Sequence, residues 1–477
     1  MSENATQQMR AALERGDFIA WQNVLFPAWR AKDATIVPVL IETMRQHQFP
    51  LRNLAAQALR DLIPQASIEQ QQEAATVMVE VLSALNPPDV YPGAAGTLAV
   101  LGQPGVEGLL AALRSPHKAA RQQAAQAFDK LSEDDRPLTE LQACLRSDDP
   151  LDRGGAALAL GVSGLPDATA DLVALLQDPD VSVRTCAADA LGHAGDGQAI
   201  PALAAAIPEP NLELRACAIN ALIAIGSTTA LDLLLAALRS DDADVRAMVA
   251  RLLYRVRDAR VTAGLIEALA DSGALVRQAA CQSLAHIRDA AALPALVPLL
   301  ADDAVPVRMD AVMALGTIED ARAIPAIIGA LQDEKEAVRT NAAWALGHIK
   351  GEQGIPALLT ALHDAESWVR MSAARSLGYI AARETLDPLL AALGDSDPDA
   401  RAAACEALGR VGLAHADSLA AVVPALAGRL DDDGQIWRLK PYNESRVADV
   451  AAMALSEINT PPARAALEAY TTPESPL

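Results

Sequence analysis

The residues of this chain that could carry chemistry recur at a fixed spacing of 31 positions. An arginine marks each copy, and the marked positions are Arg153, Arg184, Arg215, Arg246, Arg277, Arg308, Arg339, Arg370 and Arg401. Three of the ninth positions after these arginines hold a histidine, a residue type that binds zinc: His193, His286 and His348. With about 10 Å per repeat, His286 and His348 are roughly 20 Å apart, whereas zinc ligands lie about 2 Å from the ion. We therefore predict no shared metal site, no catalytic set and no cofactor.

The cysteines offer little redox chemistry. They are five in number and dispersed along the repeats: Cys144, Cys186, Cys217, Cys281 and Cys405. Cys186 and Cys217 occupy equivalent places in adjacent repeats, where stacked helices stand roughly 8–10 Å apart. A disulfide needs a Cα separation of about 4.4–6.8 Å. We predict reduced cysteines that serve as small buried residues.

The fifth and ninth positions after each arginine align on one face of a helix and change in character near residue 250. Beyond that point they gather arginine, histidine, methionine, tryptophan and tyrosine, the residue types that concentrate at interaction hot spots. The predicted partner-binding residues are Arg251, Arg255, His286, Met313, Trp344, His348, Arg375, Tyr379 and Arg410. Packing of Trp344 and Tyr379 against neighbouring helices is the alternative.

A second candidate surface lies near the C-terminus, where about 16 extra residues separate Arg401 from its next equivalent, Ala448. Inserted loops often carry recognition. The candidate contacts in this segment are Trp437, Arg438, Lys440 and Tyr442. A flap that covers the last repeat would use the same residues, so both interpretations stay open.

Paired helices must position these side chains. In the copy around Arg339, the apolar residues from Val338 to Ile349 recur in steps of three and four, which indicates a helix, here called helix B. A second helical phrase, 355–362, begins with Pro356 in its first turn and is called helix A. Equivalent turns hold aspartates that can cap helix A, namely Asp258, Asp289 and Asp320.

Neither helix can bury its apolar stripe alone, so neighbouring repeats must complete the core. We predict an all-α, right-handed α-solenoid of about thirteen stacked helix pairs, curved into a superhelix. Residues 1–50 are assigned to an N-terminal helical cap, 51–412 to the repeat array, and 413–477 to a C-terminal repeat with an inserted loop at 431–445 and a cap. The aromatic residues of the N-terminal cap are expected to be buried: Phe18, Trp21, Phe26 and Trp29.

An acidic residue stands six positions before most of the marker arginines. An arginine at the start of helix B can donate its guanidinium fork to the carboxylate in the turn of the next repeat, which would fix the angle between repeats. The predicted structural ladder comprises Asp178, Arg184, Asp271, Arg277, Asp302, Arg308, Asp333, Arg339, Asp364, Arg370, Asp395 and Arg401, with Glu209 in an equivalent place.

The pattern of aspartate, Val-Arg and Ala-Ala-x-Ala-Leu-Gly resembles the short HEAT-like repeat of the phycobilisome lyase type, over roughly residues 50–460. The resemblance implies that the aspartates and arginines are structural and that helix B lines a concave surface. Several enzymes also carry repeats of this kind. Deoxyhypusine hydroxylase carries His-Glu pairs, and no such dipeptide occurs here; epoxyqueuosine reductase has clustered cysteines, which are missing too. Bilin lyases have no short sequence motif that could be required here, so bilin lyase activity remains an alternative.

Net charge narrows the choice of partner. A formal charge of −22 disfavours nucleic acid and favours partners with basic surfaces. No apolar run reaches the roughly 18 residues of a membrane span, and the first residues lack the features of an export signal, so we expect a cytoplasmic protein. The sequence favours a non-enzymatic scaffold that binds a protein or peptide segment in a concave groove. The alternative is a bilin lyase-like or other small-ligand-handling protein.

Overall fold

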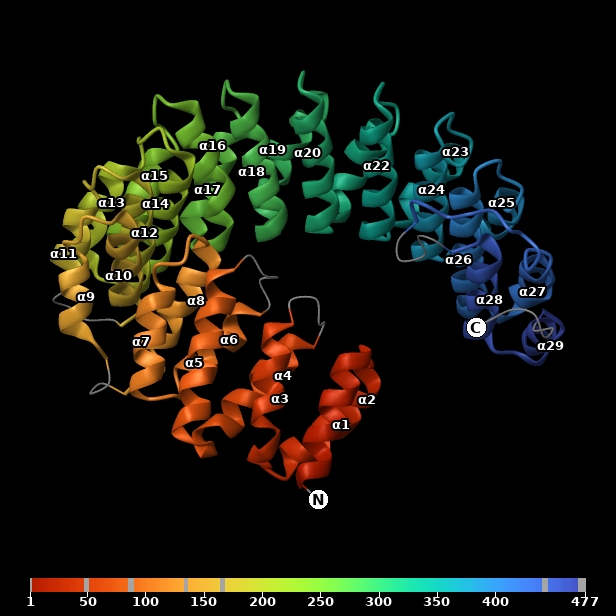
Figure 1. Ribbon diagram of the computed structural model, residues 1–477. Coiled ribbons are helices and arrows are strands. Elements are labelled where there is room, and N and C mark those ends of the chain that lie inside the picture. The colour runs from red at the N-terminus through yellow and green to blue at the C-terminus, as the bar shows by residue number, and fades with distance from the viewer. Residues whose placement is uncertain are drawn as a thin grey trace. The chain divides into compact units, whose positions relative to one another are not determined.

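The computed structural model describes residues 2–46, 51–84, 90–132, 136–163, 168–439 and 445–470 (Figure 1). These residues are helical apart from turns and one isolated β-bridge between Gln435 and Arg446. The predicted all-α solenoid is confirmed. The chain forms two compact units, unit 1 (Met1–Ala236) and unit 2 (Ala237–Leu477).

Helices A and B alternate along both units, and the even-numbered helices from α4 to α28 are helix B. Unit 1 contains α1 (Ser2–Arg15), α2 (Phe18–Arg30), α3 (Val37–Arg45), α4 (Arg52–Leu62), α5 (Ile68–Ser83), α6 (Tyr91–Leu98), α7 (Gln103–Ala112), α8 (Lys118–Phe128), α9 (Leu138–Cys144), α10 (Pro150–Val162), α11 (Ala168–Leu175), α12 (Val181–Ala194), α13 (Ile200–Ala206), α14 (Leu212–Ile225) and most of α15 (Thr228–Ala237).

Unit 2 continues the same alternation. It contains α16 (Ala243–Leu252), η5 (Leu253–Arg255), α17 (Ala259–Ala268), α18 (Ala274–Ile287), α19 (Leu293–Leu296), η7 (Val297–Ala301), α20 (Val305–Ile318), α21 (Ile324–Ala330), α22 (Glu336–Ile349), α23 (Ile355–Ala361), α24 (Ser367–Ile380), α25 (Leu386–Ala392), α26 (Pro398–Ala414), α27 (Leu419–Ala427), α28 (Val447–Ile458) and α29 (Pro461–Tyr470). Short 3-10 turns precede many of the A helices, such as η8 (Ala321–Ala323) before α21.

Capping residues set where these helices begin and end. Asp242 and Asp397 accept backbone N–H bonds at the starts of α16 and α26, and Asp320 does the same for η8. Pro356 lies in the first turn of α23, where a missing N–H has no cost. Several B helices end at a residue in the left-handed conformation, Gly195 in unit 1 and Arg288 in unit 2 among them.

The Leu-Gly of the repeat brings consecutive B helices into close contact. A Cβ added to Gly347 would lie 2.4 Å from the Cβ of Ser376, and one added to Gly378 would lie 2.5 Å from the Cα of Ala407. The same approach recurs at Gly161, Gly192, Gly316 and Gly409. B helices therefore pack against one another far more extensively than A helices do. Within each unit the B helices lie on the inner side of the curve and the A helices on the outer side (Figure 1).

Arginine–carboxylate pairs join the turns of successive repeats. In each pair the arginine Nε and Nη2 bond the two carboxylate oxygens at 2.7–3.0 Å, while Nη1 donates to the carbonyl oxygen six residues earlier in its own turn. The pairs are Arg153–Asp178, Arg246–Asp271, Arg277–Asp302, Arg308–Asp333, Arg339–Asp364, Arg370–Asp395 and Arg401–Asp432. Arg184 departs from the pattern, because among the described residues its one carboxylate contact is with Glu209, at 4.0 Å.

The N-terminal helix pair corrects one expectation. Trp21 is buried, but Phe18 and Phe26 are each 42% exposed, and Trp29 is half-buried with its Nε1 donating to Asp61 Oδ2 at 3.1 Å. The reason is position: α2 belongs to the first helix pair, so one of its faces meets no preceding repeat in the part of unit 1 that the structure describes.

Candidate functional site

The predicted partner-binding residues lie along the B helices of unit 2. Arg251 on α16, Arg255 in η5 and His286 on α18 are exposed. The others, on α20 to α26, are half-buried: Met313, Trp344, His348, Arg375, Tyr379 and Arg410. We call the surface formed by these nine residues the B face. It recurs along unit 2 because these residues hold the fifth or the ninth position after the marker arginine of their repeats.

Aromatic stacking fixes part of the B face. The rings of Trp344 and His348 stack with centroids 4.6 Å apart and an interplanar angle of 24°. The Trp344 ring also lies over Gly316 on the preceding B helix, where a Cβ would come within 2.9 Å of Cζ3. Trp344 therefore packs against its neighbours and still presents surface to solvent.

Tyr254 belongs to the same face but was not predicted. Its ring lies 4.6 Å from that of His286 and is 40% exposed. Helical spacing within the repeat predicted that Arg255 lies among the partner-binding residues. Because α16 ends at Leu252 and continues as the 3-10 turn η5, the spacing no longer applies there.

Two arginines and a tyrosine form a cationic cluster at the C-terminal end of the B face. The guanidinium carbon of Arg410 lies 4.2 Å from the Tyr379 ring centroid, and that of Arg375 lies 5.9 Å from it. Glu406 is buried beneath them, with Oε1 accepting from Arg410 at 2.6 Å and Oε2 lying 3.3 Å from Arg375 Nε. One buried carboxylate thus orients two arginines, and the cluster keeps one net positive charge.

Unit 1 differs in that polar side chains of its inner face are paired with one another. Lys118 at the start of α8 reaches Glu213 at the start of α14 at 2.5 Å, although α10 and α12 come between them in sequence. Gln122 likewise donates to Asp189 on α12 at 2.9 Å. The aromatic and cationic contacts described above lie in unit 2.

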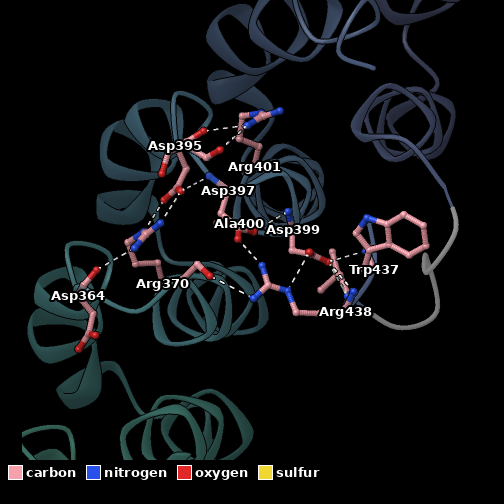
Figure 2. Close-up of polar contacts among 12 residues, drawn as sticks. Asp364, Arg370, Asp395, Asp397, Asp399, Ala400, Arg401, Trp437 and Arg438 are labelled. Carbon is pink, nitrogen blue, oxygen red and sulfur yellow. Dashed lines mark hydrogen bonds and ion pairs between the residues drawn. The ribbon is translucent and has the colours of Figure 1, made fainter. Parts of the chain in front are cut away.

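The inserted loop is held against the turns of the preceding repeats (Figure 2). Arg438 bonds Asp399, Ser367 and Asp397, and its guanidinium lies over the Trp368 ring at 4.8 Å. Asp399 Oδ1 accepts the backbone N–H groups of residues 437–439 at 2.7–3.2 Å.

The outcome for the four predicted loop contacts is mixed. Arg438 is used to hold the loop in place, whereas Trp437 is 68% exposed. Lys440 and Tyr442 lie outside the described residues. Asp432, at the start of the insertion, accepts the fork of Arg401 and so carries the series of ion pairs across the extra residues.

The sequence pattern of HEAT repeats matches residues 106–188, 169–250, 231–316, 305–377 and 355–440, which together cover more than half of the chain. The chain belongs to the HEAT-repeat family. No curated protein matches it in sequence.

Solved structures with the same fold include karyopherins. A structure of Kap95p with RanGDP matches with a TM-score of 0.57 and 16% identity, over 99% of this HEAT-repeat chain and 68% of the other. Kap121p bound to the extreme C-terminus of the protein phosphatase Cdc14p matches with a TM-score of 0.53 and 15% identity, over 95% and 56%. Kap121p bound to Nup53p gives 0.52 and 15%, over 96% and 57%. The chain thus spans just over half the length of Kap121p, and at these identities the likeness concerns the fold alone.

The cysteines and the possible metal ligands of the described HEAT repeats have the following environments. Burial raises the pKa of Cys217 to about 11 and those of Cys281 and Cys405 to about 12, so these thiols stay protonated at neutral pH. Within the described ranges no group of three or more histidine, cysteine or acidic side chains is placed to hold a metal ion. The same ranges contain no helix with the length and hydropathy needed to span a bilayer.

Proposed function

We propose that this HEAT-repeat protein is a non-enzymatic scaffold that binds a segment of another protein along the B face of unit 2. The observation that carries the proposal is the series of ordered aromatic and cationic side chains contributed by η5, α18, α22, α24 and α26, from Tyr254 to Arg410. Stacking and ion pairs already hold these side chains, so binding would cost little additional side-chain entropy.

Charge and residue type narrow the partner. The B face offers cations and aromatic rings, whereas the adjoining turns carry exposed acids such as Asp303, Glu334 and Glu366. A protein segment with mixed side chains can match both, while a uniformly charged polymer such as nucleic acid would be repelled by one of them. Kap121p, which shares the fold, is bound to the proteins Cdc14p and Nup53p in its solved structures, and this supports a protein partner here as well. A cytoplasmic location stays a prediction.

Affinity capture with variants of two B-face residues tests the proposal. Purified protein is used to capture partners from its native cell extract, and the retained proteins are identified by mass spectrometry. Trp344→Ala and Arg410→Ala should each lower capture of the same partner by about tenfold or more, because central aromatic and arginine side chains dominate interface energies. Arg464→Ala, at an exposed arginine of α29 outside the B face, is the control and should capture normally. Undiminished capture by both B-face variants, with unchanged circular dichroism, would refute the proposal.

A small-ligand function of the phycobilisome lyase type is the second candidate. The observation in its favour is an open cavity of about 440 Å³ beside α18 and α20 on the same face. Mixing the purified protein with a bilin tests it directly. A shifted absorbance band or a covalent adduct would support this candidate, and an unchanged spectrum with no adduct by mass spectrometry would exclude it.

A further inference from the structure

The cavity on the B face contains an acid that the repeat pattern did not single out. Asp310 on α20 lines the cavity together with Met313, and Gln282, His286 and Arg288 line it from the side of α18. Its volume of about 440 Å³ falls within the roughly 300–1,000 Å³ typical of sites that enclose a small molecule or a few side chains.

The Asp310 carboxylate is fixed by the neighbouring helix. Gln278 and Gln282, one helical turn apart on α18, each donate their side-chain amide to Asp310 Oδ2, at 2.9 and 2.8 Å. Oδ1 receives no hydrogen bond from the residues that the structure describes, and none of the described arginines, lysines or histidines pairs with this acid. Asp310 is only half-buried. It is therefore an oriented anion with one oxygen left for a cationic donor.

The other end of the cavity is positive. Arg288 follows the last residue of α18 in the left-handed conformation, with φ of 59°, and is exposed. A non-glycine residue in this conformation costs about 1 kcal/mol or more. Arg288 forms an ion pair with Glu319 at 3.6 Å, and its side chain is still 57% exposed and accessible to a second anion. Met313 lies among these lining residues and adds an apolar surface.

We propose that this cavity binds a lysine or arginine side chain of the partner segment, with the cationic head on Asp310 and a nearby acidic residue of the same segment on Arg288. Charge complementarity at both ends supports this occupant, and a purely apolar side chain would leave the Asp310 carboxylate desolvated without compensation. Nucleic acid has no cation to offer Asp310. The inference rests on the proposed function, because it specifies the chemistry of a segment bound to the B face.

Methionine methyl groups provide the test, since Met313 lines the cavity. The full-length protein is labelled with ¹³C at its methionine methyls, Met313 is assigned through Met313→Leu, and the probe is the capped peptide acetyl-Ala-Arg-Ala-Glu-Ala-amide. An isolated contact of this size should have a Kd of about 1–10 mM. The Met313 methyl signal should shift on titration, whereas that of Met78, buried in unit 1, should not.

Two variants and three further ligands sharpen the result. Asp310→Asn keeps the size of the side chain and removes the charge, and it should weaken the Met313 response by about tenfold. Arg288→Gln should weaken binding of the charged peptide but leave binding of the Ala-Arg-Ala-Gln-Ala analogue unchanged. The analogue Ala-Gln-Ala-Gln-Ala should produce no shift, and free arginine should bind more weakly than the charged peptide.

Three outcomes would overturn the inference: a silent Met313 methyl up to about 10 mM charged peptide, an Asp310→Asn response equal to that of the parent, or free arginine binding as tightly as the peptide. Partner capture separates this failure from failure of the scaffold function. If Trp344→Ala abolishes capture while Met313 stays silent, the B face binds a protein but the cavity does not take its cation.

Discussion

Arg277 holds Asp302 with both arms of its guanidinium fork, Nε at 2.7 Å from Oδ2 and Nη2 at 2.8 Å from Oδ1. Its Nη1 also donates to the carbonyl oxygens of residues 271 and 272, and Asp302 Oδ1 accepts the backbone N–H of Ala304 at 2.9 Å. One arginine thus ties the turn of its own repeat to the turn of the next. The carboxylate at the same time shapes the turn in which it lies.

Removing this carboxylate should loosen the contact between the two repeats. Asp302→Asn leaves the Arg277 fork without its anion in a part-buried site, and we expect a loss of about 1.5–3 kcal/mol, the range for hydrogen bonds to charged groups. The neighbouring exposed acid gives the matched control, Asp303→Asn, which should be nearly neutral. Urea unfolding followed by circular dichroism measures both, and equal midpoints for the two variants would contradict the prediction.

The ion pairs also set how stability depends on pH. Hydrogen bonds from the partner arginines lower the pKa of Asp178, Asp271, Asp302, Asp364 and Asp432 from the ordinary value of 3.8. A carboxylate whose pKa is lower in the folded state binds fewer protons there than in the unfolded state. Its contribution is complete above a pH of about 4 and is lost as the pH falls through the folded-state pKa.

Thermal melts between about pH 2 and pH 6 should therefore show a flat melting temperature above about pH 5 and a steep fall below about pH 4. Several carboxylates shift in the same direction, so their effects add. Asp302→Asn should show a shallower fall than the parent chain, because it lacks one of the titrating groups. A melting temperature that stays constant down to about pH 2 would contradict this account.

Much of this architecture could be predicted because the period is fixed. Once Val338 to Ile349 is assigned to a helix, every equivalent segment follows, and the offset of Asp302 from Arg277 places the acid in the next turn. The B-face residues from Met313 to Arg410 share one helical register for the same reason. Where they bind a partner is still a prediction.

Features that depend on departures from the repeat could not be predicted from its period. Tyr254 lies on the B face because α16 ends at Leu252, before the helical register would place another residue there. The orientation of Asp310 depends on two glutamines of another helix. The anchoring of Arg438 uses acids about 40 positions earlier, which no local pattern indicates. Phe18 and Phe26 were expected in the interior because aromatic residues favour burial, but each is 42% exposed on α2, in the first helix pair that the structure describes.

Glu209 holds a position in the series of ion pairs that is aspartate in most other repeats. Shortening its side chain to aspartate should strengthen the ion pair with Arg184. Its carboxylate lies 4.0 Å from Arg184 Nη2 and is 43% exposed, whereas the aspartates at equivalent places bond both arms of the arginine. Glu209→Asp should let the carboxylate accept both the fork and the N–H of Asn211. We expect a gain of about 0.5–1 kcal/mol, measured as a raised melting temperature. Glu213→Asp, which shortens another acid of unit 1 and draws it away from Lys118, should not raise it.

Gly347 should not tolerate a larger residue, because a Cβ added at this position would lie 2.4 Å from the Cβ of Ser376 on the next B helix. Gly347→Ala is expected to cost about 1–3 kcal/mol through overpacking. The control is Gly329→Ala in the helix α21, where a Cβ would meet nothing within 4 Å. That substitution should be neutral or stabilising by about 0.5–1 kcal/mol, as expected of alanine in a helix. The pair separates steric contact between repeats from helix propensity, and identical shifts for both would show that propensity alone acts.

Arg438 should determine whether the inserted loop stays against the repeats. It contacts Asp397, Asp399, Ser367 and the Trp368 ring, so Arg438→Ala removes the side chain that joins the loop to two preceding turns. We expect limited chymotrypsin digestion after Trp437 to become about tenfold faster, which corresponds to roughly 1.4 kcal/mol less cost for local opening. Arg464→Ala, at an exposed arginine whose side chain bonds Asn459 and does not contact the loop residues that the structure describes, is the control and should be cut at the parent rate. If the Arg438 variant resists as well as the parent chain, then the buried Ile436 and Leu439 side chains suffice to hold the loop.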